Sequence, residues 1–212
     1  MHFRWKIAQF FEVRWWQHYL SRHDKDAYLN WKRQYWLDFL QKNNLEIPPD
    51  ATVLDAGCGP AGIFTVLENK TIDALDPLLD AYEKSLPHFR RSDYPQVRFF
   101  TTPLEFFLPD KKYDVVFCLN ALNHVADLSL SLNCLATLTQ PGGTLAVSVD
   151  AHNYVWLKKI FRLFPADILH PHQFEIKEYR AMLTARDFQI QKEVLLKKEG
   201  IFNYYLLVAK KP

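Results

Sequence analysis

Residues 53–62 read Val-Leu-Asp-Ala-Gly-Cys-Gly-Pro-Ala-Gly, and the rest of the chain is arranged around them. Branched apolar residues, then Asp55, then a Gly-x-Gly-x-x-Gly pattern predict a strand, a tight turn and a helix beginning near Ala61. Gly57 and Gly59 can adopt positive φ angles and let a ligand lie against the backbone. The free N–H groups of that helix would face the same ligand. The stretch therefore indicates a site for a nucleotide-like cofactor.

Composition narrows the class of protein. The 212 residues are 49% hydrophobic, enough for one domain with a small extension, and the net charge is +2 with no dense run of Lys or Arg. We therefore expect no nucleic-acid partner and no integral membrane association, because no apolar run approaches the roughly 18–20 residues of a membrane span. Three cysteines without metal-ligand spacing favour reduced thiols and a cytoplasmic location. His170 and His172 lack a third ligand, so we expect no metal site. A homodimer is left open.

The first 47 residues differ from the rest in composition. Apolar side chains at helical spacing predict one helix over residues 3–20, with Phe3, Ile7, Phe10, Phe11, Trp15 and Tyr19 on one face. Asp24 is a candidate N-cap for a second helix that ends near Asn43. Five of the six tryptophans lie in the first 36 residues. We therefore divide the chain into a helical N-terminal extension, 1–47, and an α/β domain, 48–212.

Strands and helices alternate from residue 51 onward. The predicted strands are Thr52–Ala56, Thr71–Leu75, Val97–Phe100, Tyr113–Leu119 and Thr144–Val149. The predicted helices are 61–69, 78–86, 126–139 and 175–186. The last two strands, 188–196 and 201–209, are separated by only four residues, which predicts an antiparallel hairpin. The expected fold is a doubly wound, mainly parallel seven-stranded sheet with a C-terminal antiparallel hairpin.

Two acids help to identify the cofactor. Asp76 ends the second predicted strand, where a carboxylate can accept two hydrogen bonds from a ribose diol. Asp55 stands just before the glycines, where it would repel a pyrophosphate but tolerate a sulfonium with an amino-acid tail. The residues alone leave open an NAD-dependent oxidoreductase and a non-catalytic binding module that keeps the fold.

Four stretches together resemble the class I S-adenosylmethionine-dependent methyltransferases. VLDAGCGPAG is similar to their first motif, and ALD, ending at Asp76, to their ribose-binding acid. YDVVFCLNALNHVAD is similar to their fourth strand and the following loop, and LTQPGGTLAVSV to the turn before their fifth strand. The resemblance covers roughly residues 50–209. It implies a Rossmann-like methyltransferase domain over 48–212 that binds S-adenosylmethionine and a small-molecule acceptor.

The resemblance also implies which residues contact the cofactor. Asp55 and the glycines would meet its methionyl part, Asp76 would hold the ribose hydroxyls, and Glu105 would hold the adenine edge. The full set of implied cofactor residues is Asp55, Gly57, Cys58, Gly59, Asp76, Pro77, Leu104, Glu105 and Asn120.

Methyl transfer is an in-line displacement, and a base is needed only where the acceptor must lose a proton. His124, in the loop after the fourth strand, is the best-placed candidate base. Residues 120–123 lack the Asn-Pro-Pro-Tyr type stretch that aligns the amino nitrogen in methyltransferases of nucleic-acid bases and glutamine, which favours a small aromatic or lipid-like acceptor. We expect the acceptor pocket to use Trp15, Trp16, Trp31, Tyr35, His152 and Tyr154. The alternative for the aromatic residues is that they only pack the two N-terminal helices on the sheet.

Overall fold

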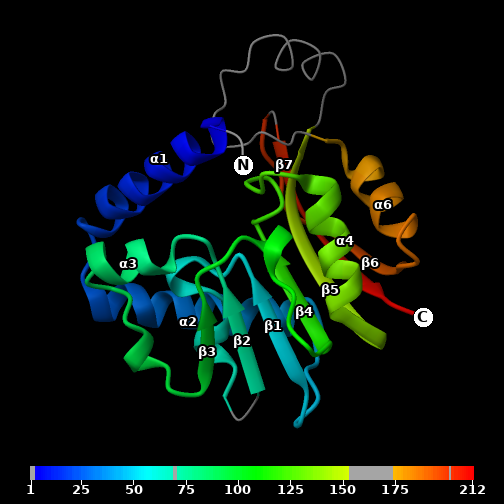
Figure 1. The fold of residues 1–212 in the computed structure, drawn as a ribbon, viewed down its shortest axis with the longest axis horizontal. Coiled ribbons are helices and arrows are strands. Elements are labelled where there is room, and N and C mark those ends of the chain that lie inside the picture. The colour runs from blue at the N-terminus through cyan, green and yellow to red at the C-terminus, as the bar shows by residue number, and fades with distance from the viewer. Residues whose placement is uncertain (1–2, 69–70, 153–173, 201) are drawn as a thin grey trace.

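The computed structural model describes residues 3–68, 71–152, 174–200 and 202–212. A seven-stranded sheet in the order β3-β2-β1-β4-β5-β7-β6 crosses the molecule (Figure 1). The first five strands pair in parallel, and β7 pairs antiparallel with both β5 and β6. The strands are β1 Thr52–Ala56, β2 Thr71–Leu75, β3 Val97–Phe100, β4 Tyr113–Leu119, β5 Thr139–His152, β6 Gln189–Lys197 and β7 Phe202–Lys210. The predicted fold class is confirmed.

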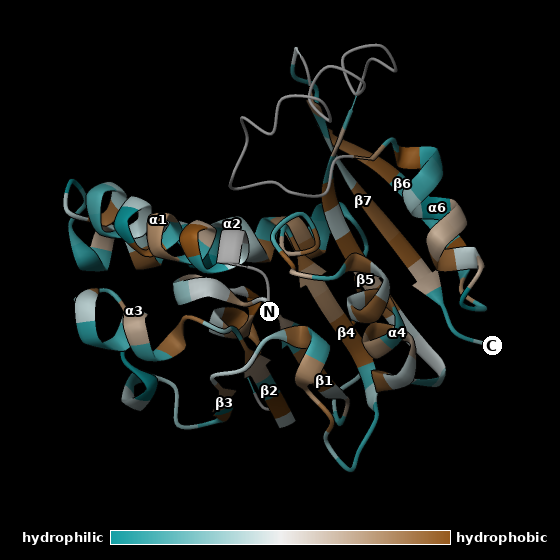
Figure 2. Ribbon diagram, turned by 45° about the horizontal axis from the view of Figure 1, so that its top comes forward, coloured by the Kyte–Doolittle hydropathy of each residue, from teal (hydrophilic) through white to brown (hydrophobic). Residues whose placement is uncertain are grey.

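Alternate side chains of the strands enter two separate cores. In β1, Val53 belongs to a core shared with α2 and α3, whereas Leu54 belongs to a core shared with α4 and α6. This alternation follows from the two-residue period of a strand that is covered on both faces. Figure 2 shows the resulting apolar strands between more polar helices. The helices are α1 Phe3–Leu20, α2 Lys25–Lys42, α3 Leu79–Ser85, α4 Leu128–Leu138 and α6 Ile176–Thr184.

The second N-terminal helix begins where its cap predicts. The Asp24 carboxylate accepts a hydrogen bond from the Ala27 N–H at 2.9 Å, which satisfies one of the free donors of the first turn of α2. Tyr28, Trp36 and Phe39 of α2 are buried in the core that also contains β1. In the part of the chain that the structure describes, no helix has the length and apolarity needed to cross a membrane.

The predicted helix over 61–69 is wrong. Two short 3-10 helices, η1 Gly59–Ala61 and η2 Ile63–Val66, stand there, separated by extended backbone at Gly62. Glycine and the branched residues of this stretch have weak helix propensity, and the Asp55 carboxylate binds the Phe64 N–H at 3.1 Å. A Cβ atom at Gly62 would lie 2.4 Å from Asp55 Oδ2, so this close approach requires glycine.

One further expectation needs correction. The fifth strand starts at Thr139 rather than Thr144, because Thr139 pairs with Tyr113 and the Gly142 N–H donates to the Lys211 carbonyl at 2.7 Å. On α1, the rings of Phe10 and Phe11 are exposed, at 54% and 48%. The side of α1 that lines the cavity instead mixes polar and aromatic residues.

Candidate active site

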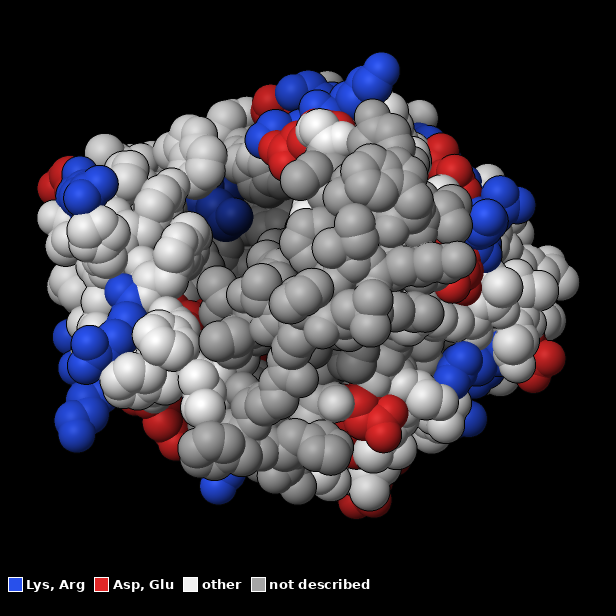
Figure 3. Space-filling model, turned by 90° about the horizontal axis from the view of Figure 1, so that it is seen from above, with Lys and Arg blue, Asp and Glu red and all other residues white. Residues whose placement is uncertain are grey.

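The loops at the carboxyl ends of β1, β2 and β4 meet the inner sides of α1 and α2 around a cavity of about 680 Å³. This is the edge of a doubly wound sheet where ligands bind. Seen from above, this side of the molecule is hollowed, with Lys or Arg atoms inside the hollow (Figure 3). The site therefore combines loops of the α/β domain with both N-terminal helices.

The glycine loop after β1 is fixed by backbone contacts. The N–H groups of Gly57 and Cys58 both donate to the Leu75 carbonyl, at 2.8 and 3.0 Å. Gly57 has a φ of 73°, and a Cβ there would lie 2.3 Å from the Ala121 Cβ. Gly59 has a φ of 57°, but its missing Cβ would point into space whose nearest atom, on Trp16, is 4.0 Å away. Gly57 thus allows two loops to touch, and Gly59 leaves room inside the cavity.

Asp76 connects the second strand to this loop. One carboxylate oxygen accepts the Gly59 N–H at 3.0 Å and the other accepts the Leu78 N–H at 2.8 Å. Burial, together with the negative charge of Glu12, raises the pKa of Asp76 to about 7. The carboxylate lines the cavity beside Pro77, as predicted for a group that accepts ligand hydroxyls.

Asp55 lies behind the glycine loop and not on the cavity wall, where the sequence placed it against the methionyl part of the cofactor. It is 2% exposed, does not line the cavity, and holds the Phe64 N–H behind the glycine loop. Burial raises the pKa of Asp55 to about 7, against the opposing effect of the hydrogen bond from Phe64. In this structure Asp55 supports the loop from behind.

Leu104 and Glu105 line the cavity from η4 Leu104–Phe106, after β3. The Glu105 carboxylate already accepts the N–H groups of Ala126 and Asp127, at 2.8 and 3.0 Å. It therefore ties the segment after β3 to the start of α4, in addition to any ligand that it meets.

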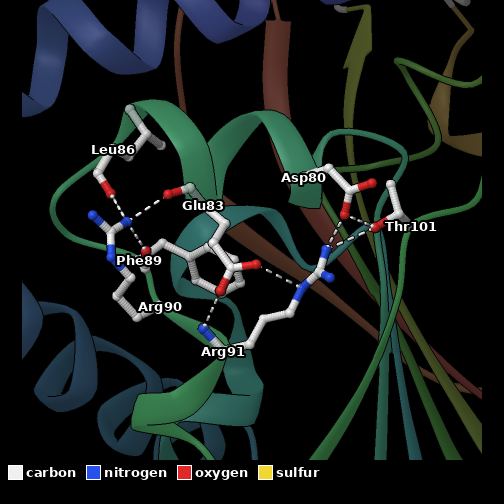
Figure 4. Close-up of polar contacts among 7 residues, drawn as sticks. All are labelled: Asp80, Glu83, Leu86, Phe89, Arg90, Arg91 and Thr101. Atoms are coloured by element: carbon white, nitrogen blue, oxygen red, sulfur yellow. Dashed lines mark hydrogen bonds and ion pairs between the residues drawn. The ribbon is translucent and has the colours of Figure 1, made fainter.

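Arg91 braces the same end of the site from outside. Its guanidinium binds Asp80 of α3 and donates to Thr101 Oγ1, just after β3, at 2.7 Å (Figure 4). Its backbone N–H donates to the Glu83 carboxylate at 3.1 Å. The helix after Asp76 and the segment before η4 are thereby joined.

The loop after β4 forms the other wall. Asn120 has a φ of 55°, and its N–H donates to Ser148 Oγ at 2.9 Å. Asn120 and His124 both line the cavity, and the Trp5 indole N–H donates to the His124 carbonyl at 3.0 Å. The predicted base is therefore on the cavity wall, on a loop that α1 contacts.

Four of the six predicted acceptor-pocket residues line the cavity: Trp15, Trp16, Trp31 and Tyr35. His152 does not line it. Its ring lies against Phe202, with centroids 4.3 Å apart and the ring planes tilted by 42°, and the residue is 5% exposed. Tyr154 lies outside the described residues, as do His170 and His172.

The sequence prediction missed several polar residues of the cavity, among them Gln9, Glu12 and Lys32. Glu12 accepts a hydrogen bond from the Tyr82 hydroxyl at 3.1 Å. The signal was present in the spacing, because Gln9 and Glu12 lie three residues apart on the face of α1 that also carries Trp16. Polar residues on a helix usually mark its solvent side, so the pattern favoured the opposite face.

Lys32 is a cation among aromatic rings. Its Nζ lies 4.6 Å from the Trp36 ring centroid and 4.8 Å from that of Tyr35. Burial lowers its pKa to about 8, and the negative charge of Asp55 opposes that shift. No carboxylate of the described residues forms an ion pair with it, whereas Lys197, also on the cavity wall, pairs with Glu199. Lys32 therefore offers the cavity a positive charge that no described acid neutralises.

Known proteins resemble this chain over different lengths. An uncharacterized methyltransferase of Mycobacterium tuberculosis is 33% identical over 103 residues, so the chain spans about half, 48%, of that relative. These residues are 45% of the present chain. A ubiquinone biosynthesis O-methyltransferase of Rickettsia typhi is 24% identical over 188 residues, 75% of this chain and 73% of that protein.

A solved N-methyltransferase from Bradyrhizobium japonicum, in complex with S-adenosylhomocysteine, aligns with a TM-score of 0.62. The alignment covers 91% of this chain and 90% of that one at 13% identity, which bears on the fold alone. A family model described as methyltransferase domain matches residues 28–193, well over half of the chain. The match includes the glycine loop, Asp76 and the loop after β4. The chain belongs to this methyltransferase family, the class I S-adenosylmethionine-dependent enzymes that its motifs resemble.

Proposed function

We propose that this methyltransferase acts on a small aromatic or lipid-like acceptor, which the N-terminal residues 1–47 help to enclose. The observation that carries the proposal is the aromatic wall of the cavity, formed by α1 and α2 opposite the loops after β1 and β4. Trp15, Trp16, Trp31 and Tyr35 all line it. Rings of this kind favour flat or apolar ligands, at roughly 0.5–1.5 kcal/mol per aromatic pair.

The cavity fits the cofactor in two respects. The space that a side chain at Gly59 would fill is open, so a ligand can lie against this backbone. The buried Asp76 carboxylate stands at the same loop and provides acceptors for ribose hydroxyls. Bound S-adenosylmethionine supplies an activated methyl group.

The residues of the chain then have the task of alignment. Asn120 borders the space between the glycine loop and the aromatic wall, where acceptor and methyl group must meet. Holding the reactants in line can contribute on the order of 7–11 kcal/mol. For a phenolic acceptor, His124 would remove the hydroxyl proton, because a histidine titrates near neutral pH.

Lys32 would hold the carboxylate at the amino-acid end of the cofactor. It lines the cavity near enough to Asp55 to interact with its charge, and Asp55 lies directly behind the glycine loop. A cation between aromatic rings and without an ion pair among the described residues gains an anionic ligand at little desolvation cost.

The names of the relatives support the class of acceptor. The Rickettsia typhi relative is named for ubiquinone biosynthesis and for O-methyl transfer, which supports a lipid-like acceptor that is methylated on oxygen. At 24% identity this agreement supports the acceptor class and not a particular compound.

The experiment is a turnover assay. The purified chain is incubated with S-adenosylmethionine and a panel of phenols, prenylated phenols, fatty acids, amines and peptides, and S-adenosylhomocysteine formation is followed. We expect product with phenols or lipid-like compounds only. Turnover confined to amines or peptides would refute the acceptor class, and a calorimetric titration that finds NAD binding but no S-adenosylhomocysteine binding would refute the function.

A further inference from the structure

One face of α1 covers the cavity. Besides Trp15, the residues of α1 that line the cavity are Trp5, Gln9, Glu12, Trp16 and Tyr19, which follow one another at steps of four and three residues. This spacing places them on one side of a helix. The face contains two polar side chains between aromatic rings, so it offers specific hydrogen-bonding groups to whatever fills the cavity.

Glu12 is anchored to the helix that follows Asp76. Its carboxylate accepts the Tyr82 hydroxyl of α3 at 3.1 Å and a further hydrogen bond from the Trp16 side chain. Tyr82 is fully buried, so its hydroxyl fixes the carboxylate in place. Figure 1 shows α1 passing over α3 on this side of the sheet. The position of Glu12 is thus set by neutral donors.

Glu12 and Asp76 both line the cavity, and the negative charge of Glu12 raises the pKa of Asp76. Within the described part of the chain, no Lys or Arg forms an ion pair with either carboxylate, and burial raises the pKa of both. Two like charges in a buried space disfavour each other. A ligand that brings two neutral hydroxyl donors between them would satisfy both without introducing charge.

Gln9, one turn before Glu12 on α1, has a side-chain amide with an unused hydrogen-bond donor. Its side-chain nitrogen is buried and has no hydrogen-bond acceptor in the described structure. Since Gln9 also lines the cavity, this helix face presents both a donor and an acceptor that the protein alone does not fully use.

We propose that Glu12 is a second ribose-binding carboxylate, which together with Asp76 holds the two hydroxyls of the cofactor ribose, one hydroxyl to each acid. The inference rests on the proposed function, which supplies the cofactor. It assigns half of the ribose site to the N-terminal helix, outside the glycine loop and the strand ends. It also predicts weak binding of a nucleotide with a 2′-phosphate, because that phosphate would face two carboxylates.

The test compares changes in the protein with changes in the ligand. Calorimetry measures binding of S-adenosylhomocysteine and of its 2′-deoxy and 3′-deoxy analogues to the full chain. The variants are Glu12→Gln, Asp76→Asn and, as a control, Glu46→Gln, whose side chain is exposed. Circular dichroism verifies that each variant is folded.

We expect Glu12→Gln to weaken S-adenosylhomocysteine binding about tenfold, the effect of replacing a charged acceptor by a neutral one. The same variant should bind one of the two deoxy analogues as the unchanged protein does, because the hydroxyl held by Glu12 is already missing. Asp76→Asn should show the complementary pattern with the other analogue, and Glu46→Gln should change nothing.

Three outcomes would overturn the proposal. Equal weakening of all three ligands by Glu12→Gln means that Glu12 only supports the helix, and unchanged binding means that it does not touch the cofactor. If the unchanged protein binds no S-adenosylhomocysteine, the proposed function fails and this inference fails with it. In the first two cases the proposed function stands.

Discussion

The carboxylate of Asp76 accepts a hydrogen bond from the backbone N–H of Gly59 at 3.0 Å. The acid at the end of β2 and the glycine loop after β1 are therefore one unit. A second bond, from the Leu78 N–H, fixes the carboxylate from its other side. This geometry orients the remaining lone pairs of Asp76 before a ligand arrives.

Replacing Asp76 by alanine removes a charged acceptor from the cofactor site. We expect Asp76→Ala to weaken S-adenosylhomocysteine binding by about 1.5–3 kcal/mol, the range for hydrogen bonds to charged groups. Isothermal titration calorimetry measures the change, and Asp50→Ala, at an exposed position, is the control. An unchanged dissociation constant would remove Asp76 from the ribose site.

Alanine variants of two glycines with similar positive φ angles can distinguish an effect on stability from an effect on cofactor binding. Gly59 and Gly142 both have positive φ, 57° and 75°, and neither would place a Cβ closer than 4.0 Å to another atom. Alanine at either position should cost about 1–2 kcal/mol of unfolding free energy. Only Gly59→Ala should also weaken S-adenosylhomocysteine binding, by about tenfold or more, because its methyl group enters the cavity. Equal binding by both variants would show that the cofactor does not approach Gly59.

Gly57→Ala should behave differently from both. Its Cβ would lie 2.3 Å from the Ala121 Cβ, so the two loops would have to separate. We expect a loss of unfolding free energy at least about 2 kcal/mol greater than for Gly142→Ala, since overpacking adds to the backbone strain. Urea denaturation compares the two variants. Equal midpoints would mean that the loop after β4 can move aside freely.

The protonation of Asp55 should make stability depend on pH. Its pKa is raised to about 7 in the folded protein, so the folded state binds a proton more tightly than the unfolded state. The resulting stabilisation is present at low pH and is lost as the pH rises toward and through 7. Asp55→Asn, which keeps an acceptor for Phe64, should therefore gain stability relative to the unchanged protein between pH 5 and 8, by up to about 4 kcal/mol.

Urea denaturation at four pH values between 5 and 8 measures this difference for Asp55→Asn. Asp50→Asn is the control, because its side chain is exposed. Stability curves of Asp55→Asn and the unchanged protein that run parallel would show that Asp55 titrates in the folded state as it does in the unfolded chain.

Removing the charge of Lys32 should affect only those ligands that carry the amino-acid end of the cofactor. Lys32→Met removes the charge and keeps much of the side-chain length, so the aromatic packing is preserved. We expect binding of S-adenosylhomocysteine to weaken about tenfold, and binding of 5′-methylthioadenosine, which lacks the amino acid, to stay unchanged. Lys42→Met, on the exposed end of α2, is the control. If acceptor affinity alone fell, Lys32 would belong to the acceptor site.

His124 should matter only when the acceptor must lose a proton. For a phenolic acceptor, His124→Ala should lower kcat by about 10²–10⁴-fold, the usual contribution of a general base. S-adenosylhomocysteine binding should be unaffected, and His18→Ala, on exposed α1 surface, should leave turnover unchanged. Full activity of the His124 variant would end its assignment as the base.

The sequence predicted the sheet because strand signals are local. Apolar runs such as Tyr113–Leu119, bounded by turn residues, are readable without knowledge of their neighbours. The same holds for the Asp24 cap. The prediction of a helix over 61–69 failed because the Phe64 N–H donates to the Asp55 carboxylate instead of to a carbonyl within a helix. The spacing of residues in the sequence does not predict a tertiary contact of this kind.

The cofactor loop was predicted more completely than the polar lining. Glycines and acids at strand ends have fixed positions relative to the sheet, so Gly59 and Asp76 could be placed from their spacing. Glu12 and Lys32 lie on helices that cover the site, and which side of such a helix faces inward depends on how it docks. The exposed rings of Phe10 and Phe11 show that hydrophobic spacing does not tell which side of α1 faces the cavity.

The hydrogen bond from the Trp5 indole to the His124 carbonyl joins the covering helix to the loop that carries the candidate base. If this end of α1 swings outward, that bond breaks, and the loop loses a restraint at the same moment as the cofactor gains an exit. Release of S-adenosylhomocysteine and loss of order in the loop after β4 would then occur together. The same hydrogen bond would then tie the placement of His124 to the presence of α1 over the cavity.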